Sequence, residues 1–153
     1  MKPLKVALFG CGSMIAMFMV VVVAGLIWLG SGPQGGVMLP NEMEEYATAY
    51  LAEHKILHED EELLAYYDAT MSLDGTEAAI VTTKRFVYHK NGKNDVLSLK
   101  EIEDVQHRQE GIIGDVFEIM SSSGKMLKVE VAPFNGGETF KTVLTKAWQT
   151  AKK

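Results

Sequence analysis

Cysteine is nearly absent from this chain of 153 residues, and the single one, Cys11, lies inside a long apolar run. The rest of the chain therefore has neither the paired cysteines of a disulfide framework nor the clustered thiolates of a cysteine-based metal site. With so little cysteine, its usage does not indicate a redox compartment.

Positive charge is also scarce. From Asn41 onward, 13 Lys and Arg stand against 20 Asp and Glu, which gives a net charge of −7. Binding to nucleic acid without sequence preference depends on clustered Lys and Arg that neutralise phosphates, so this balance argues against a nucleic-acid partner. It also argues against a domain held flat on anionic lipid by charge.

Motifs that declare an enzyme are missing as well. The chain has no phosphate-binding loop, no dinucleotide fingerprint and no Gly-x-Ser-x-Gly elbow. The acidic stretch 58–62 lacks the alternating ligands and central glycine of a calcium loop, which favours a solvated turn. His54 and His58 would form a metal pair only if a predicted helix continued past both of them. We therefore expect no catalytic residues, no cofactor and no metal site.

One long apolar run stands out near the N-terminus. Residues 6–29 carry no charge over 24 positions, and Trp28 lies near one end. About 20 apolar residues suffice for a helix to cross the hydrocarbon layer, so the run predicts a transmembrane helix. A cleaved signal peptide has a shorter apolar core, and a lipoprotein signal at Cys11 would need its apolar stretch before the cysteine. Both remain alternatives.

The charges that flank this run predict its orientation. Lys2 and Lys5 precede it, and no Lys or Arg follows until Lys55. The excess of positive charge on cytoplasmic flanks places residues 1–5 in the cytoplasm and the C-terminal domain outside the cytoplasmic membrane. Small residues also recur every four positions along the helix, a spacing that lets two helices approach closely. The predicted dimer face consists of Gly12, Ala16, Val20 and Ala24.

The segment after the anchor changes character twice. Residues 30–40, which begin with four glycines and one proline in seven positions, predict a linker. Residues 41–55 then predict a short amphipathic helix, with glutamates in its first turn. Its apolar stripe consists of Met43, Tyr46, Ala47, Tyr50, Leu51 and His54.

From residue 56 to the C-terminus the pattern is that of a β-rich domain. Short apolar segments alternate with the turn dipeptides Asp74-Gly75, Asn91-Gly92 and Ser123-Gly124, and Gly111 to Gly114 bends the chain. Seven strands are predicted, over residues 63–70, 77–82, 85–90, 95–99, 102–108, 115–121 and 126–132. A closing helix from Glu138 presents Phe140, Val143, Leu144, Ala147, Trp148 and Ala151 on one face. The expected fold is α+β and mainly β, a seven-stranded antiparallel barrel capped by the C-terminal helix.

Several segments together suggest a family. Residues 61–67, 79–88, 96–105 and 136–140, with Trp148, resemble bacterial pleckstrin-homology-like domains, which are related in shape to the GRAM group. The resemblance spans roughly residues 56–151 and rests on core residues and turns. Relatives that bind phosphoinositides use Lys and Arg around the first hairpin, whereas Met71 to Glu77 contains no basic residue and two acidic ones. The resemblance therefore does not imply phosphoinositide binding here.

A basic cluster does occur near the second and third predicted strands. It consists of Lys84, Arg85, Lys90 and Lys93. Such residues commonly protect strand edges, and they are also the candidates for contact with an anion or a lipid. The leading expectation is a single-pass membrane-anchored interaction module that binds a protein partner or itself, through a sheet edge or a groove beside the C-terminal helix. The alternative is a lipid- or anion-sensing domain that uses this basic cluster.

Overall fold

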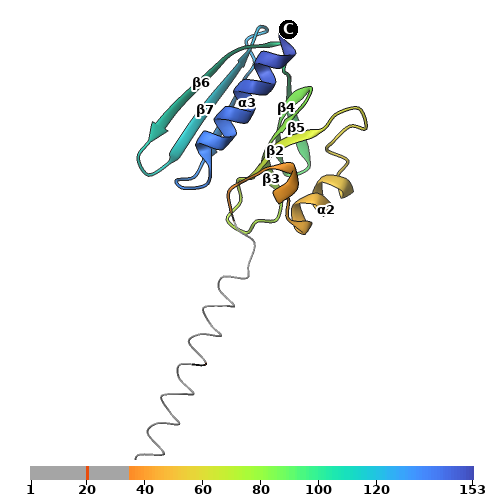
Figure 1. The fold of residues 1–153 in the computed structure, drawn as a ribbon, viewed down its shortest axis with the longest axis vertical. Helices are drawn as coiled ribbons and strands as arrows, with labels where there is room; N and C mark the ends of the chain where they lie inside the picture. The colour runs from red at the N-terminus through yellow and green to blue at the C-terminus, as the bar shows by residue number, and fades with distance from the viewer. Residues whose placement is uncertain (1–19, 21–34) are drawn as a thin grey trace, which may run out of the picture. The chain divides into compact units, whose positions relative to one another are not determined.

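The computed structural model describes residue 20 and residues 35–153. All seven predicted strands are confirmed, each with ends within two residues of the predicted ones (Figure 1). They are β2 (Leu63–Asp68), β3 (Glu77–Thr82), β4 (Arg85–Lys90), β5 (Lys93–Ser98), β6 (Ile102–Glu110), β7 (Gly114–Ser121) and β8 (Met126–Val131). The closing helix is α3 (Gly137–Ala151).

The strands form two antiparallel sheets instead of the closed barrel that the sequence predicted. Sheet A has the order β1-β2-β3-β4-β5 and sheet B the order β6-β7-β8. Within residues 35–153, no ladder joins β5 to β6, although they follow each other in the chain. The helix α3 lies over the open side between the sheets, where the Trp148 indole donates a hydrogen bond to the Ile102 carbonyl oxygen at 2.9 Å. A helix therefore closes a gap that strand pairing leaves open.

The inner core lies between the two sheets and α3. Phe140 of α3 is fully buried, with ring centroids 5.2 Å from Phe117 of β7 and 6.4 Å from Phe86 of β4. The edge-to-face arrangement of these rings is the one that aromatic quadrupoles favour. One side chain from each sheet thus meets one from the helix, which ties the three layers together.

The segment before β2 contains two elements that the sequence did not predict, β1 and η1, followed by the predicted helix. Val37–Met38 form the short strand β1, which pairs with β2 inside the stretch expected to be linker. Residues Pro40–Glu42 then form a 3₁₀ turn, η1, and the helix α2 covers only Glu45–Glu53 instead of 41–55. The helix ends where Lys55 adopts a φ of +50°, and the Ile56 N–H closes the turn on the Leu51 carbonyl oxygen at 3.0 Å.

The helix α2 packs against the outer face of sheet A. Its Ala47 and Leu51 are buried against Tyr66 and Ile80 of the sheet, in a second core that also contains Met38, Ile56, Ala78 and Val87. Sheet A is thus covered on both faces.

The predicted membrane segment, residues 6–29, lies outside the described residues except for Val20, and so do residues 1–5 and the first part of the predicted linker. Among the residues that the structure describes, no helix is long and apolar enough to cross a membrane.

Candidate functional site: a groove beside the C-terminal helix

The structure does not bring the predicted basic cluster together. Lys84 and Arg85 lie at the β3–β4 turn, whereas Lys90 and Lys93 flank the β4–β5 turn, at the other end of β4. Five strand steps separate Arg85 from Lys90, which is about 16 Å at the usual rise per residue. Two pairs of cations therefore stand in place of one four-residue site.

Arg85 is committed to a structural ion pair. Its guanidinium donates to Glu61 through Nε at 2.9 Å and through Nη2 at 2.5 Å, and Nη2 also donates to the Ile56 carbonyl oxygen at 2.6 Å. The side chains of Arg85 and Glu61 are only 12% and 1% exposed. Burial opposes the charge on Glu61, yet the hydrogen bonds from Arg85, the His58 backbone and Thr82 leave the pKa of that carboxyl below its usual range. This pair fastens the segment after α2 to sheet A.

Two exposed lysines of the cluster, Lys84 and Lys90, also form ion pairs. Lys84 contacts Asp60, and Lys90 Nζ lies 2.9 Å from Glu77, which also accepts a hydrogen bond from the Tyr88 hydroxyl. Burial and the adjacent Glu77 raise the pKa of Tyr88 above its usual value, so that the hydroxyl stays a donor. Within the described part of the chain, only Lys93 of the four cations has no carboxylate partner.

The predicted helix-dimer face lies almost wholly outside the described residues. Gly12, Ala16 and Ala24 are not among them. Val20 is, and its side chain is 67% exposed.

A groove of about 330 Å³ lies between α3 and the β3–β4 end of sheet A. Leu64 of β2 and Thr83 of the β3–β4 turn form one wall, and one face of α3 forms the other. The helix contributes Val143, Lys146, Ala147 and Thr150. Pockets for small ligands start at about this volume, so the groove suits one or two apolar side chains of a bound segment better than a large cofactor.

The rim of the groove carries the local positive charge. Lys146 is exposed and forms no ion pair among the described residues, and Lys84 follows Thr83 on the opposite side. Because Lys84 already pairs with Asp60, Lys146 is the lysine available to a ligand here, and in a domain of net charge −7 it favours a segment that places a carboxylate next to an apolar side chain. Sequence reasoning proposed a groove beside this helix without naming the residues that line it, since Leu64 and Thr150 are far apart in the chain.

A second polar cluster escaped the sequence analysis. His107 of β6 and Asp115 of β7 are hydrogen-bonded, Nε2 to Oδ1 at 2.7 Å, and a carboxylate oxygen of Glu138 at the start of α3 lies within 4.8 Å of both. The His107 ring stacks on Phe117, with centroids 4.8 Å apart. One imidazole and two carboxylates are donors that Zn²⁺ accepts, yet Glu138 also pairs with Lys141 at 3.6 Å. No sequence spacing signals this cluster because each member comes from a different element.

Close packing explains why Asp115 sits where it does. A Cβ on Gly137 would lie 2.0 Å from Asp115 Oδ2, so only glycine at that position lets the first turn of α3 approach the carboxylate. The buried pair of Asp115 and His107 thereby joins the start of α3 to sheet B. We interpret the cluster as a structural contact that positions α3 beside the groove.

Two sheets, an inner core and a C-terminal helix over the open side define a pleckstrin-homology-like domain. In accordance with this, the family model described as "Bacterial PH domain" matches residues 57–140, and the chain belongs to that family. Domains of this kind are typically interaction modules and not catalysts. The structure is also similar to the crystal structure of a DUF1696 family protein with a pleckstrin-homology domain from Shewanella loihica PV-4. That likeness has a TM-score of 0.50 at 15% identity, and covers 78% of this chain and all of the other. No curated protein matches the chain.

The carboxylates of Asp68 and Asp74 hold the connection of the first hairpin, between β2 and β3, through hydrogen bonds. Asp68 is buried and accepts hydrogen bonds from the Thr70 and Gly75 N–H groups at 2.8 Å. Hydrogen bonds from the hydroxyls of Thr76 and Ser72 lower the pKa of Asp74 to about 2. A loop held by two carboxylates, with no Lys or Arg, lacks the chemistry that clamps a phosphate.

Proposed function

We propose that this chain is a single-pass membrane-anchored interaction module, which binds a segment of a protein partner in the groove beside α3. The observation that carries the proposal is the groove itself, an apolar hollow at the surface of an interaction-module fold, with a lysine on its rim that forms no ion pair within the described part of the chain. The ligand segment would insert one or two apolar side chains and place a carboxylate near Lys146. Amphipathic segments dock in hydrophobic grooves of other proteins in this way.

The anchor is proposed from sequence. Residues 6–29 have the length and the apolar character of a membrane span, and Lys2 and Lys5 favour a cytoplasmic N-terminus with the domain outside. We expect the full-length protein to stay in the membrane pellet after carbonate extraction. Protease added to spheroplasts should digest the domain. A domain protected until the membrane is lysed would reverse the orientation.

The alternative role, contact with a lipid or an anion through Lys84, Arg85, Lys90 and Lys93, has weaker support. The four residues occupy two ends of one strand, and three of them already face carboxylates. An anion would have to compete with those partners at each position.

Site-specific photocrosslinking in native membranes tests the groove. A photoreactive residue replaces Thr150, which lines the groove, and in a matched control it replaces Gln106, which is exposed on β6 of sheet B. We expect one protein to crosslink at position 150 and not at position 106, and the K146E substitution to weaken that product severalfold. A product composed of two copies of this chain would identify self-association. Equal labelling at both positions, or none at position 150, would rule the groove out.

A further inference from the structure

Large apolar side chains project into solvent from three separate connections of the domain. Met71 lies in the β2–β3 connection, Ile112 and Ile113 at the β6–β7 tip, and Phe134 in the β8–α3 connection. Met71, Ile112 and Phe134 are 104%, 96% and 105% exposed, and Ile113 is 43% exposed. Side chains of this size are seldom left fully exposed by folding unless something else covers them, and a group of them marks an interaction surface.

The three connections lie at one end of the domain. At the β6–β7 tip, Gly114 packs against the Val131 carbonyl oxygen and Pro133, so the tip adjoins the β8–α3 connection. A Cβ on Gly35 would lie 3.7 Å from Leu73 and 3.8 Å from Asn135, which joins the β2–β3 connection to the same place. We call Met71, Ile112, Ile113 and Phe134 the apolar end.

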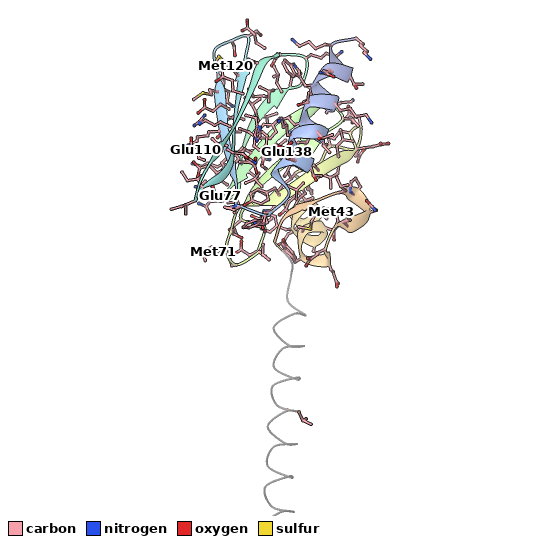
Figure 2. The ribbon with its side chains drawn as sticks, turned by 60° about the vertical axis from the view of Figure 1, so that its left-hand side comes forward. Met43, Met71, Glu77, Glu110, Met120 and Glu138 are labelled. Atoms are coloured by element: carbon pink, nitrogen blue, oxygen red, sulfur yellow. The ribbon has the colours of Figure 1, made fainter. Side chains whose placement is uncertain are left out.

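The other exposed apolar side chains of the domain lie elsewhere. Met120 and Met126 are 36% and 51% exposed, and they face each other across β7 and β8 at the far end of these strands. Figure 2 shows Met71 and Met120 at opposite ends of the domain. The apolar end thus coincides with the end at which Gly35 begins the described domain.

That end is also the one closest along the chain to the apolar run. Only five residues, 30–34, separate Leu29 from Gly35. Even when fully extended, the six steps from Leu29 to Gly35 reach at most about 20 Å. If residues 6–29 span the bilayer, the apolar end is therefore never far from the membrane surface.

Charged groups beside the apolar end mostly have partners of their own. Glu110 pairs with Arg108 at 2.5 Å, and Glu138 pairs with Lys141 at 3.6 Å. Asp74 accepts hydrogen bonds from hydroxyls, its Oδ2 lying 2.7 Å from the Ser72 hydroxyl, and no Lys or Arg among the described residues forms an ion pair with it. Lys93, at the start of β5, has no carboxylate partner among the described residues, and the Asn91 N–H donates to the Thr76 carbonyl oxygen at 2.8 Å, which places the β4–β5 turn beside the β2–β3 connection. A single lysine near the surface contributes only about 1 kcal/mol of attraction to anionic lipid, so most of the attraction to a membrane has to come from the apolar side chains.

We propose that the apolar end rests on the bilayer surface, with Met71, Ile112 and Phe134 inserted among the lipid headgroups, so that the anchored domain stands upright on the membrane and presents the α3 groove away from it. This inference rests on the anchor that we propose above. It adds an orientation and a second membrane contact to that tether. The contact depends mainly on the apolar side chains, and anionic lipid adds little to it.

Spin labelling of the full-length protein in phosphatidylcholine–phosphatidylethanolamine liposomes tests this contact. In a Cys11→Ser background, a nitroxide is placed at Ile112→Cys, or at Ser122→Cys on the exposed β7–β8 tip as a matched control. We expect the label at 112 to be reached by lipid-soluble oxygen more readily than by a water-soluble nickel complex, and the label at 122 to show the reverse. Addition of anionic lipid should leave this difference between the two labels in place.

A third labelled position separates insertion from simple proximity. A label at Met71→Cys should move towards water when Ile112 and Phe134 are both replaced by Ser, and should stay in place when Met120 and Met126 are replaced instead. Circular dichroism verifies that each variant is folded. A label at 112 that resembles the one at 122, in protein that resists carbonate extraction, overturns the contact and leaves the anchor standing. Spin–spin broadening at 112 would reveal a second copy there and also overturn it. Protein that carbonate removes refutes the anchor and the contact together.

Discussion

The two sheets of this domain are covered very differently. Sheet A is buried on both faces, by α3 and sheet B on the inside and by α2 on the outside, whereas no described helix or sheet covers the outer face of sheet B, where Val116 is buried but Met120 is exposed. The burial patterns of the strands reflect this difference. Strand β3 is buried at five consecutive positions, while β8 alternates strictly between exposed and buried residues. A strand with two covered faces needs apolar residues on both, which is why Ala78, Ala79, Ile80 and Val81 run without interruption.

The two helices therefore contribute differently to stability. The helix α3 contacts both sheets, so its loss would open the inner core. The helix α2 contacts only the outer face of sheet A, so it can open while the inner core persists.

The Phe140→Ala substitution should destabilise the domain most. Phe140 is fully buried and touches Phe86 and Phe117, one from each sheet. Truncation of a buried phenylalanine costs about 3–5 kcal/mol, because it removes apolar contact and leaves a cavity. Chemical denaturation measures the loss, with the exposed Thr142→Ala on the same helix as control. A loss below about 1 kcal/mol would show that α3 does not hold the two sheets together.

The Glu61→Ala substitution should cost about 3 kcal/mol, because it leaves the buried Arg85 guanidinium unpaired. It should also change the pH dependence. The pKa of Glu61 is lowered in the folded state, so its stabilising contribution is complete above its unfolded pKa and is lost as the pH falls through the folded value. A plot of the free energy of unfolding against pH, between about pH 5 and pH 2, should therefore be flatter for the isosteric variant Glu61→Gln than for the wild type. Parallel curves would contradict this assignment.

The Leu51→Ala substitution tests the outer layer alone. Leu51 is buried between α2 and sheet A, and its truncation should cost about 2–3 kcal/mol. Hydrogen exchange should accelerate at the amides of α2 and remain slow in α3, because only the outer core is weakened. The exposed Glu53→Ala is the control. Equal acceleration in both helices would mean that the two layers unfold as one unit.

The same asymmetry explains what could be predicted from the sequence. Strands β2 to β8 and α3 followed from local patterns, because Asn91-Gly92 and similar turns fix the hairpins and each apolar face has one regular period. The packing of α2 on sheet A could not be predicted, since its partners Tyr66 and Ile80 signal only that a second face is covered and not by which element. The barrel prediction was wrong because closure depends on how β5 and β6 meet, which no local pattern encodes.

The candidate site residues show the same limit of local sequence patterns. Lys84, Arg85, Lys90 and Lys93 are close in sequence, but strand geometry puts them at two ends of β4. The groove lined by Leu64 and Val143, and the cluster of His107 and Asp115, arise from residues that only the fold brings together.

The Tyr50→Phe substitution should have a smaller effect, about 1 kcal/mol. The Tyr50 hydroxyl lies 3.0 Å from Nε2 of buried His89, whose Nδ1 lies 2.6 Å from the Asn94 side-chain oxygen. Loss of the hydroxyl leaves one ring nitrogen of His89 without its partner. Tyr66→Phe is the informative control, because the Tyr66 hydroxyl is buried and has no hydrogen-bond partner among the described residues. That second substitution should be neutral or slightly stabilising in a thermal melt, whereas equal losses would mean that the His89 contact adds nothing.

The smallest effect is expected on the open face of sheet B. Met126 is 51% exposed and lies opposite Met120, which is 36% exposed, with water on that side. Exposed positions of this kind change stability by less than about 0.5 kcal/mol, so Met126→Gln should leave the unfolding midpoint of the purified protein almost unchanged. The same substitution on a covered face would cost several times more, since a polar amide would lose its water. A large loss at Met126 in native membranes, absent from the purified protein, would therefore show that a partner covers sheet B in the cell, and the asymmetry between the two sheets would belong to the isolated domain alone.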